Sequence, residues 1–227
     1  MKLRFTLASA ALALILSSAF AIAQTAQVTW GAYTTNGVGT ASGQPLPLGD
    51  AVLVGTFDIS NSTIAANATN YSFLLSHWTQ FASSTIGFGS PNGSGDNSGY
   101  WLSSNNNSTL ALGIAGQPIY YWVFNSPTPA LATQYGIFTA STSPNSTVSS
   151  AWKFPSDTSI PNTTITDLNQ VPHDSTGILF GSYGTGISSD GSSPLYNLAV
   201  IPEPGSAILL LSGGALIIAV RRRFRRS

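Results

Sequence analysis

The middle of the chain alternates between short apolar runs and polar stretches rich in Gly, Ser and Asn. The clearest apolar run, Ala51–Ile59, predicts a strand buried on both faces. Pro118–Phe124 predicts a second strong strand, and the alternation in Gln27–Tyr33 predicts a third. Shorter pieces have the same strand-like character: Tyr100–Leu102, Thr109–Leu112, Tyr135–Ala140, Ser150–Phe154, Thr163–Thr166, Gly177–Phe180 and Leu195–Val200.

One segment has helical spacing instead. Its apolar positions include Phe73, Leu74, Trp78 and Phe81, which predicts a helix over about residues 70–82 packed on the sheet. Residues 34–49 and 83–98 are expected to be loops. Strands separated by frequent turn signals, with few helices, predict a mainly β fold. We expect an antiparallel β-sandwich, jelly-roll-like or barrel-like, with one short helix, plus a C-terminal hydrophobic helix.

The N-terminal end has the three parts of a secretory signal peptide. Lys2 and Arg4 are followed by an apolar run, Leu7–Leu16, and then by Ala21-Ile22-Ala23. This order predicts a signal peptide over residues 1–23, cut between Ala23 and Gln24. A cut after Ala21 and an uncleaved membrane anchor are the alternatives.

The C-terminal end contains a short hydrophobic segment. Val200-Ile201-Pro202-Glu203-Pro204 leads into apolar residues, and the two prolines place the start of a helix after Pro204. A helix over about residues 206–220 would reach roughly 22 Å at about 1.5 Å per residue. Because a hydrocarbon core measures about 30 Å, and Gly213-Gly214 weakens the helix, this segment is better suited to a transient stop than to a lasting anchor.

Basic residues close the chain and predict its orientation. Clustered positive charge stays on the cytoplasmic side of a membrane, so the body of the protein is expected outside. An ordinary single-pass tail anchor is the alternative. The cluster consists of Arg221, Arg222, Arg223, Arg225 and Arg226.

Residues 200–227, with Pro-Glu-Pro, apolar span and arginine cluster in that order, resemble the PEP-CTERM family of sorting tails. The resemblance implies that an exosortase, a membrane protease, recognises Pro202, Glu203 and Pro204. It also implies passage through the secretion machinery, transient attachment to the inner membrane of a Gram-negative bacterium that makes exopolysaccharide, and release to the outer surface or extracellular matrix. Within the body, Gly43–Phe57, Gly116–Phe124 and Trp152–Pro155 resemble uncharacterised proteins with such tails.

Residues 24–199 have a length that suits one exported domain. The whole chain has a formal net charge of zero, but most of its basic residues lie in the two ends. The body keeps Lys153 as its single basic residue against seven aspartates, which leaves a charge of −6. An acidic body argues against nucleic acid as a partner. The absence of cysteine excludes disulfides and thiolate sites.

No residue pattern in the body predicts catalysis. His173-Asp174 is the only acid–base pair adjacent in sequence, and no G-x-S-x-G motif accompanies it. Its position between Pro172 and Ser175 favours a turn. His77, among apolar helix positions, is expected to pack or to lie at the surface, and a pair of carboxylates for glycoside hydrolysis cannot be nominated.

Two further patterns raise ligand hypotheses. Asp96–Gly99 and Asp190-Gly191 are oxygen-rich loops, but neither matches a calcium-binding loop and turn formation explains both, so we expect no metal site and no cofactor. Trp101, beside Tyr100, is the candidate for an exposed ring that contacts a glycan; ordinary packing is the alternative. The sequence thus predicts a surface or matrix protein without catalytic activity. An exopolysaccharide-binding module and a secreted hydrolase are the alternatives.

Overall fold

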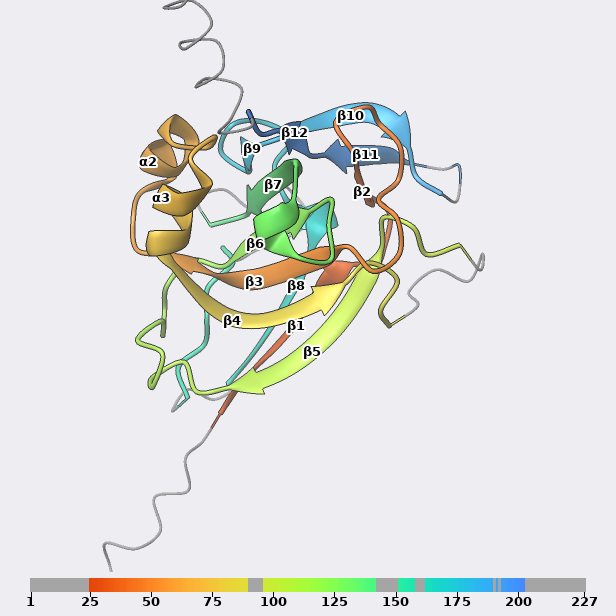
Figure 1. The fold of residues 1–227 in the computed structure, drawn as a ribbon. Coiled ribbons are helices and arrows are strands. Elements are labelled where there is room, and N and C mark those ends of the chain that lie inside the picture. The colour runs from red at the N-terminus through yellow and green to blue at the C-terminus, as the bar shows by residue number, and fades with distance from the viewer. Residues whose placement is uncertain are drawn as a thin grey trace, which may run out of the picture.

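The computed structural model describes residues 25–89, 96–141, 151–157, 162–189, 191 and 193–202. Strands make up most of the regular structure, so the expected mainly β fold is confirmed (Figure 1). The strands are β1 (Ala26–Ala32), β2 (Val38–Gly39), β3 (Ala51–Phe57), β4 (Trp78–Thr85), β5 (Trp101–Asn107), β6 (Tyr120–Phe124), β7 (Gln134–Thr139), β8 (Thr163–Asp167), β9 (Ile178–Phe180), β10 (Ser182–Ile187), β11 (Pro194–Asn197) and β12 (Ala199–Val200). The helices are α2 (Asn61–Ala66), α3 (Tyr71–Ser76) and the 3-10 turns η1 (Pro129–Leu131) and η2 (Leu168–Gln170).

A central antiparallel sheet organises the fold. Its strand order is β12-β7-β6-β3-β4, and β9 also pairs with β7. Every residue of β3 and β6 is buried, as the unbroken apolar runs predict. Such runs need cover on both faces of a sheet, and the two faces are covered by different kinds of element.

One face of the central sheet is covered by strands, and we call it the strand-closed face. A second sheet, of order β5-β1-β8, contributes Trp30 and Trp101 to a buried cluster that also contains Val52, Tyr121 and Phe138 of the central sheet. Figure 1 shows β1, β5 and β8 on the side of β3 and β4 away from α2 and α3. Both sheets therefore bury their inward side chains in one shared core.

The opposite face is covered by α2 and α3, and we call it the helix-closed face. Ile64 of α2 and Leu74 of α3 pack with Phe57, Trp122 and Tyr135 of the central sheet. Each helix has six residues, too few to be stable alone, so packing on the sheet holds them. Local caps help: the Ser60 side chain accepts from Thr63 N, and the Asn70 side chain accepts from Phe73 N.

The sheets are mixed in direction rather than wholly antiparallel. All pairs within the central sheet are antiparallel. The pair β1–β8 is parallel, and so is the pair β11–β2 in a third sheet of order β10-β11-β2. The expected antiparallel pairing is thus corrected for two pairs.

The predicted helix over residues 70–82 is only half right. Its first part is α3, but the chain turns into β4 at Trp78. Trp78 packs on Phe57 of the helix-closed face, whereas Phe81 belongs to the core of the strand-closed face. A register shift between Val54 and Gly55 leaves Phe81 as an extra residue in β4. The apparent continuation of the helical spacing through Trp78 and Phe81 therefore comes from a bulged strand with apolar residues on both sides.

Other expectations also need correction. The chain forms a second helix, α2, where no helix was predicted. Thr109–Leu112, predicted as a strand, is a turn because the Asp157 carboxylate accepts hydrogen bonds from Thr109 N at 2.8 Å and Leu110 N at 3.2 Å. Ser150–Phe154 was also predicted as a strand. Its described residues, 151–154, form one isolated bridge, between Lys153 and Pro118. The expected C-terminal helix at 206–220 lies outside the described residues.

Candidate functional site

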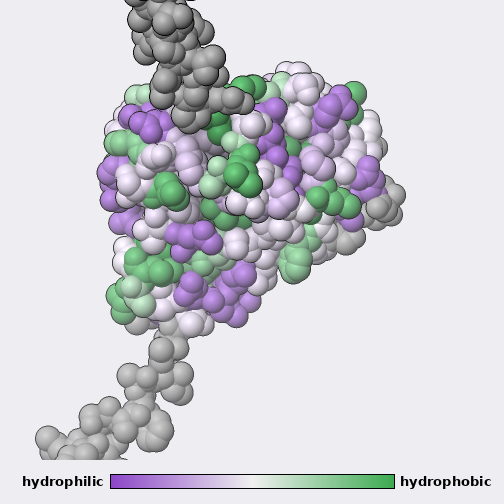
Figure 2. Space-filling view, viewed as in Figure 1, coloured by the Kyte–Doolittle hydropathy of each residue, from purple (hydrophilic) through white to green (hydrophobic). Residues whose placement is uncertain are grey.

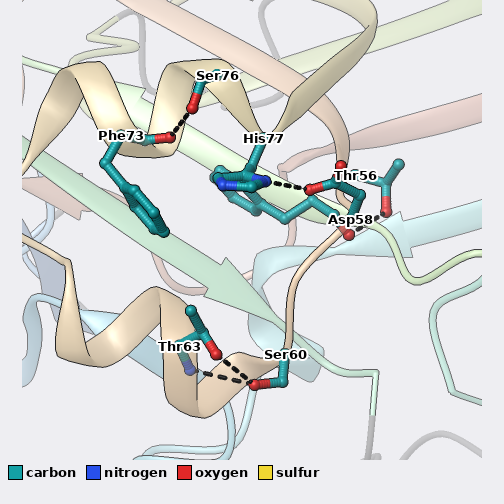
Figure 3. Close-up of polar contacts among 8 residues, drawn as sticks. Thr56, Asp58, Ser60, Thr63, Phe73, Ser76 and His77 are labelled. Carbon is teal, nitrogen blue, oxygen red and sulfur yellow. Dashed lines mark hydrogen bonds and ion pairs between the residues drawn. The ribbon is translucent and has the colours of Figure 1, made fainter.

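The structure brings together an acid–base pair that is distant in sequence. Asp58 directly follows β3 and His77 directly precedes β4, and His77 Nδ1 lies 2.6 Å from Asp58 Oδ1. Their backbones continue the β3–β4 ladder, since Asp58 N donates to His77 O at 3.1 Å. Figure 3 shows the imidazole reaching from the end of α3 to the carboxylate. The Phe73 ring, 4.7 Å from the imidazole centre, supports it from the same helix.

The hydroxyls of Ser60 and Ser76, near this pair, form hydrogen bonds with the backbone of the helices. Ser60 Oγ accepts from Thr63 N at 3.2 Å and caps α2, and Ser76 Oγ donates to Phe73 O at 2.7 Å (Figure 3). The Asp58 side chain is 71% exposed, so solvent screens it. Among the described residues, therefore, the pair has an acid–base couple but no serine held ready as a nucleophile.

A hollow of about 470 Å³ opens beside Asp58. Its lining includes Ser60 and Asn61, between the end of β3 and the start of α2, and also Gln117 and Ser141. Tyr120 lines it as well, and its hydroxyl donates to Asn61 Oδ1 at 2.7 Å. Apolar surface, hydroxyl and amide groups and one carboxylate share the lining, so the hollow offers hydrogen bonds to a polar ligand.

The second histidine is used differently. The His173 ring stacks on Tyr183 with the ring centres 3.5 Å apart. Burial lowers the pKa of His173, and the neighbouring carboxylate of Asp174 only partly opposes this. That carboxylate accepts from Thr176 N at 2.8 Å and from Thr176 Oγ1 at 2.5 Å, which closes a turn. The turn expected for His173-Asp174 is confirmed.

The aromatic pair proposed to contact a glycan is buried, so that expectation is corrected. Trp101 has no exposed surface and Tyr100 has almost none. The Trp101 ring lies against Trp30 and Tyr121, and the Tyr100 hydroxyl donates to Thr35 O at 2.9 Å. Trp101 opens β5 opposite Ala32 of β1, so its side chain points into the core between the sheets. Neither ring can stack on a sugar at the surface.

The two oxygen-rich loops lie side by side. Asp96 Oδ1 accepts from Ser98 N at 2.9 Å, which is the expected turn, and this bond lowers the pKa of Asp96. Ser189 Oγ donates to Asp96 O at 3.0 Å and ties the second loop to the first. Asp190 lies outside the described residues. Within the described ranges, no three His, Cys, Asp or Glu side chains gather as metal ligands.

Pro202 is the one residue of the expected sorting motif that the structure describes. Ala199 and Val200 form β12 on the edge of β7, and Ile201 N donates to Thr133 O at 2.9 Å. Glu203 and Pro204, the arginine cluster and the Ala23–Gln24 bond lie outside the described residues. In the part of the chain that is described, no helix has the length and apolar character needed to cross a membrane.

Comparisons with known proteins add no relative to this chain. No family model, no curated protein and no solved structure matches it.

Proposed function

We propose that this is an exported protein, sorted through its C-terminal tail to the cell surface or extracellular matrix, whose body has no catalytic role. The observation that supports this most directly is the position of the Pro-Glu-Pro motif relative to β12. Among the described residues, the backbone hydrogen bond nearest the C-terminus is made by Ile201, and the Pro-Glu-Pro motif starts at the next residue. A protease that recognises this motif would cut after β12 and leave the strands of the body intact.

The architecture of the body is consistent with a stable displayed module. We propose that its two packed sheets form a β-sandwich of the jelly-roll-like or barrel-like kind. In support, one core takes side chains from β1 and β5 on one side and from β3, β6 and β7 on the other. Packing of two inner faces around a shared core is how such sandwiches are stabilised.

Intact-mass measurement tests the sorting proposal. Protein is collected from the cell surface of a strain with the exosortase and of a matched strain without it. We expect a chain from Gln24 to the Pro-Glu-Pro region in the first strain and a chain with its tail in the second. A full-length tail in both strains contradicts the proposal.

A carbohydrate-binding module is the second candidate, and the hollow beside Asp58 favours it. Its exposed Gln117, together with Ser60, Asn61 and Ser141, offers uncharged hydrogen-bonding groups of the kind that sugars match. We expect retention on the cell's own polysaccharide to fall in Gln117→Ala and to persist in Asn106→Ala, an exposed amide on β5. Equal retention of both variants and the wild type contradicts this site.

A secreted hydrolase is the third candidate and has the weakest support. The Asp174 carboxylate is engaged in its turn, and His77 has no described serine nucleophile beside it. Turnover of a glycan or ester that is abolished by His173→Ala or by His77→Ala would restore this candidate. Turnover that persists in both variants excludes these histidines as catalytic residues.

A further inference from the structure

The surface around Ile201 and Pro202, the last described residues, is hollowed. Two adjoining hollows, of about 430 and 460 Å³, share Tyr71, Pro129 and Ala130. The first also contains Ile201 and Pro202, and the second reaches Leu75. Among the described residues, none that lines either hollow is charged. We call the surface formed by Tyr71, Leu75, Pro129–Leu131, Ile201 and Pro202 the exit surface.

Two leucines of the exit surface are exposed. Leu131 is 73% exposed on η1, and Leu75 is 47% exposed on α3. Isolated exposed leucines are common on soluble proteins. Figure 2 shows apolar residues in several separate groups among polar ones on the face that it presents, so apolar character alone does not single out the exit surface. Its position relative to the tail does.

The proposed membrane span begins four residues after Pro202, at Ser206. A chain spans at most about 3.6 Å per residue, so this connection reaches no further than about 14 Å. The headgroup layer on each side of a bilayer is about 5–8 Å thick. As long as the tail is uncut, Pro202 therefore stays within about 14 Å of the hydrocarbon, close enough for the surface around it to reach the headgroups.

The length of the span strengthens this restraint. A hydrophobic segment of roughly 22 Å is shorter than a hydrocarbon core of about 30 Å. Short segments are accommodated by local thinning of the bilayer and by drawing flanking residues towards the interior. Because the body is attached to this segment through only four residues, the same adjustment draws the body towards the membrane.

We propose that the exit surface is a lipid-contact surface. While the tail is uncut, this surface lies in the headgroup layer of the outer leaflet of the inner membrane. This inference rests on the proposed function, because the tail must span the membrane to provide the restraint. The surface is uncharged and the body carries a net charge of −6, so contact depends on apolar burial and not on anionic lipid. Cutting the tail removes the restraint and leaves a surface too small to hold the body on the membrane, which couples processing to release.

The absence of cysteine from the chain allows a direct test by single-site labelling. Leu131→Cys and, as a milder change, Ala130→Cys each carry a polarity-sensitive fluorophore on the exit surface. Leu110→Cys is the matched control, because Leu110 is 68% exposed in the turn held by Asp157 and lines neither hollow. The full chain is reconstituted into vesicles of neutral phosphatidylcholine, and quenching by lipid-borne nitroxide and by aqueous iodide is measured.

We expect labels at residues 130 and 131 to be quenched by the lipid-borne nitroxide and to lose accessibility to iodide several-fold. The label at residue 110 should show neither effect, and adding anionic lipid should not strengthen the contact. If the chain resists alkaline extraction from the vesicles but all three labels are equally open to iodide, the lipid-contact surface is wrong and the spanning tail stands. If the chain is extracted, the spanning tail fails, and this inference fails with it.

Discussion

The two faces of the central sheet are covered in different ways. The strand-closed face supports the fold, whereas the helix-closed face contains the surface features that could meet other molecules. On the strand-closed face, Trp30 Nε1 donates to Asn105 Oδ1 and Trp152 Nε1 donates to Gln170 Oε1, whereas Trp101 Nε1 and Asp50 Oδ2 have no hydrogen-bond partner among the described residues. The helix-closed face is bordered by all three hollows described above, and the Asp58–His77 pair and Pro202 lie beside them.

The reason lies in the elements that do the covering. The strand-closed face is covered by extended strands, whereas two helices of six residues leave gaps at their ends. The hollows open at those gaps: beside the start of α2, beside the start of α3, and between α3 and the segment from Pro127 to Ala130. Binding functions are therefore best sought on the helix-closed face.

The largest expected effect is on the stability of the strand-closed core. Trp101→Ala removes a fully buried ring that contacts Trp30 and Tyr121, and we expect a loss of about 3–5 kcal/mol in the free energy of unfolding. Trp78→Ala, at a partly exposed ring on the helix-closed face, should cost clearly less. Urea denaturation measures both, with Leu110→Ala as the surface control. Equal losses for the two tryptophans would contradict the division between the faces.

Neighbouring tyrosines of β6 offer a finer comparison, since their side chains point to opposite faces. The Tyr121 hydroxyl accepts from Gly31 N at 3.2 Å and lies 2.6 Å from Thr166 Oγ1, all buried. Tyr121→Phe leaves those groups without this partner and should cost about 1–3 kcal/mol in unfolding free energy. Tyr120→Phe loses one bond at the edge of a hollow, where water can replace it, and should cost less than about 1 kcal/mol. A larger cost for Tyr120→Phe would reverse the assignment of the two faces.

Asp50 gives the strand-closed face a pH dependence. The alternation of β3 places it on the side of Val52 and Val54, and no hydrogen-bond partner is found for its buried Oδ2 among the described residues. Burial raises the pKa of Asp50 from 3.8 to about 6. The folded state thus binds this proton more tightly, and the associated stability is present below pH 3.8 and lost as the pH rises through about 6.

Urea midpoints between pH 4 and pH 8 test this prediction against Asp50→Asn, which keeps the shape of the side chain. We expect the wild type to lose on the order of 1–2 kcal/mol more than the variant as the pH rises, after allowance for solvent penetration. The comparison is needed because His173, whose pKa burial lowers, contributes in the opposite direction. Parallel curves for the two proteins would exclude Asp50 as the source.

Asp157 provides the opposite case at lower pH. Burial favours its protonated form, but four hydrogen bonds, from Ser108, Thr109 and Leu110, outweigh burial and lower its pKa to about 2. Its contribution to stability is present above pH 3.8 and lost as the pH falls through about 2. Asp157→Asn should therefore remove part of the acid sensitivity below pH 4, measured by the midpoint of acid unfolding. An unchanged midpoint would contradict the assignment.

The smallest effect is expected at the exposed Asp58–His77 pair. A double-mutant cycle of Asp58→Asn and His77→Ala should give a coupling energy below about 1 kcal/mol that decreases with added salt, because the pair is open to water. A coupling of several kcal/mol would mean that the helix-closed face is held together at this point more firmly than its exposure indicates.

The strands with the strongest patterns could be predicted from the sequence, and the site could not. Ala51–Phe57 and Tyr120–Phe124 are read correctly because full burial on both faces requires unbroken apolar runs. The sequence leaves glycan contact and ordinary packing open for Trp101, because β5 continues as Ser-Ser-Asn-Asn-Asn, which looks like a loop although it is a strand with a polar outer side. The aromatic ring at its start belongs to the core.

The Asp58–His77 pair depends on long-range pairing that no local pattern reveals. The two residues are nineteen positions apart and meet because Phe57 pairs with Trp78, with both helices inserted between the strands. The only signal in the sequence is that each residue borders a strand-like apolar segment. That signal becomes informative only once β4 is recognised as a strand, and the helical spacing of Trp78 and Phe81 concealed it.

The short strand β12 also has a mechanical consequence. It is attached to β7 by two residue pairs, and Ile201 adds one hydrogen bond beyond them. Tension applied through the tail acts on the free end of this strand, so its bonds break one after another rather than together. Peeling Ala199–Ile201 from the edge would lengthen the connection by about 10 Å at roughly 3.4 Å per residue. Peeling also withdraws Ile201 from its packing against the helix-closed core, while β9 stays paired with Ile137 and Phe138 of β7.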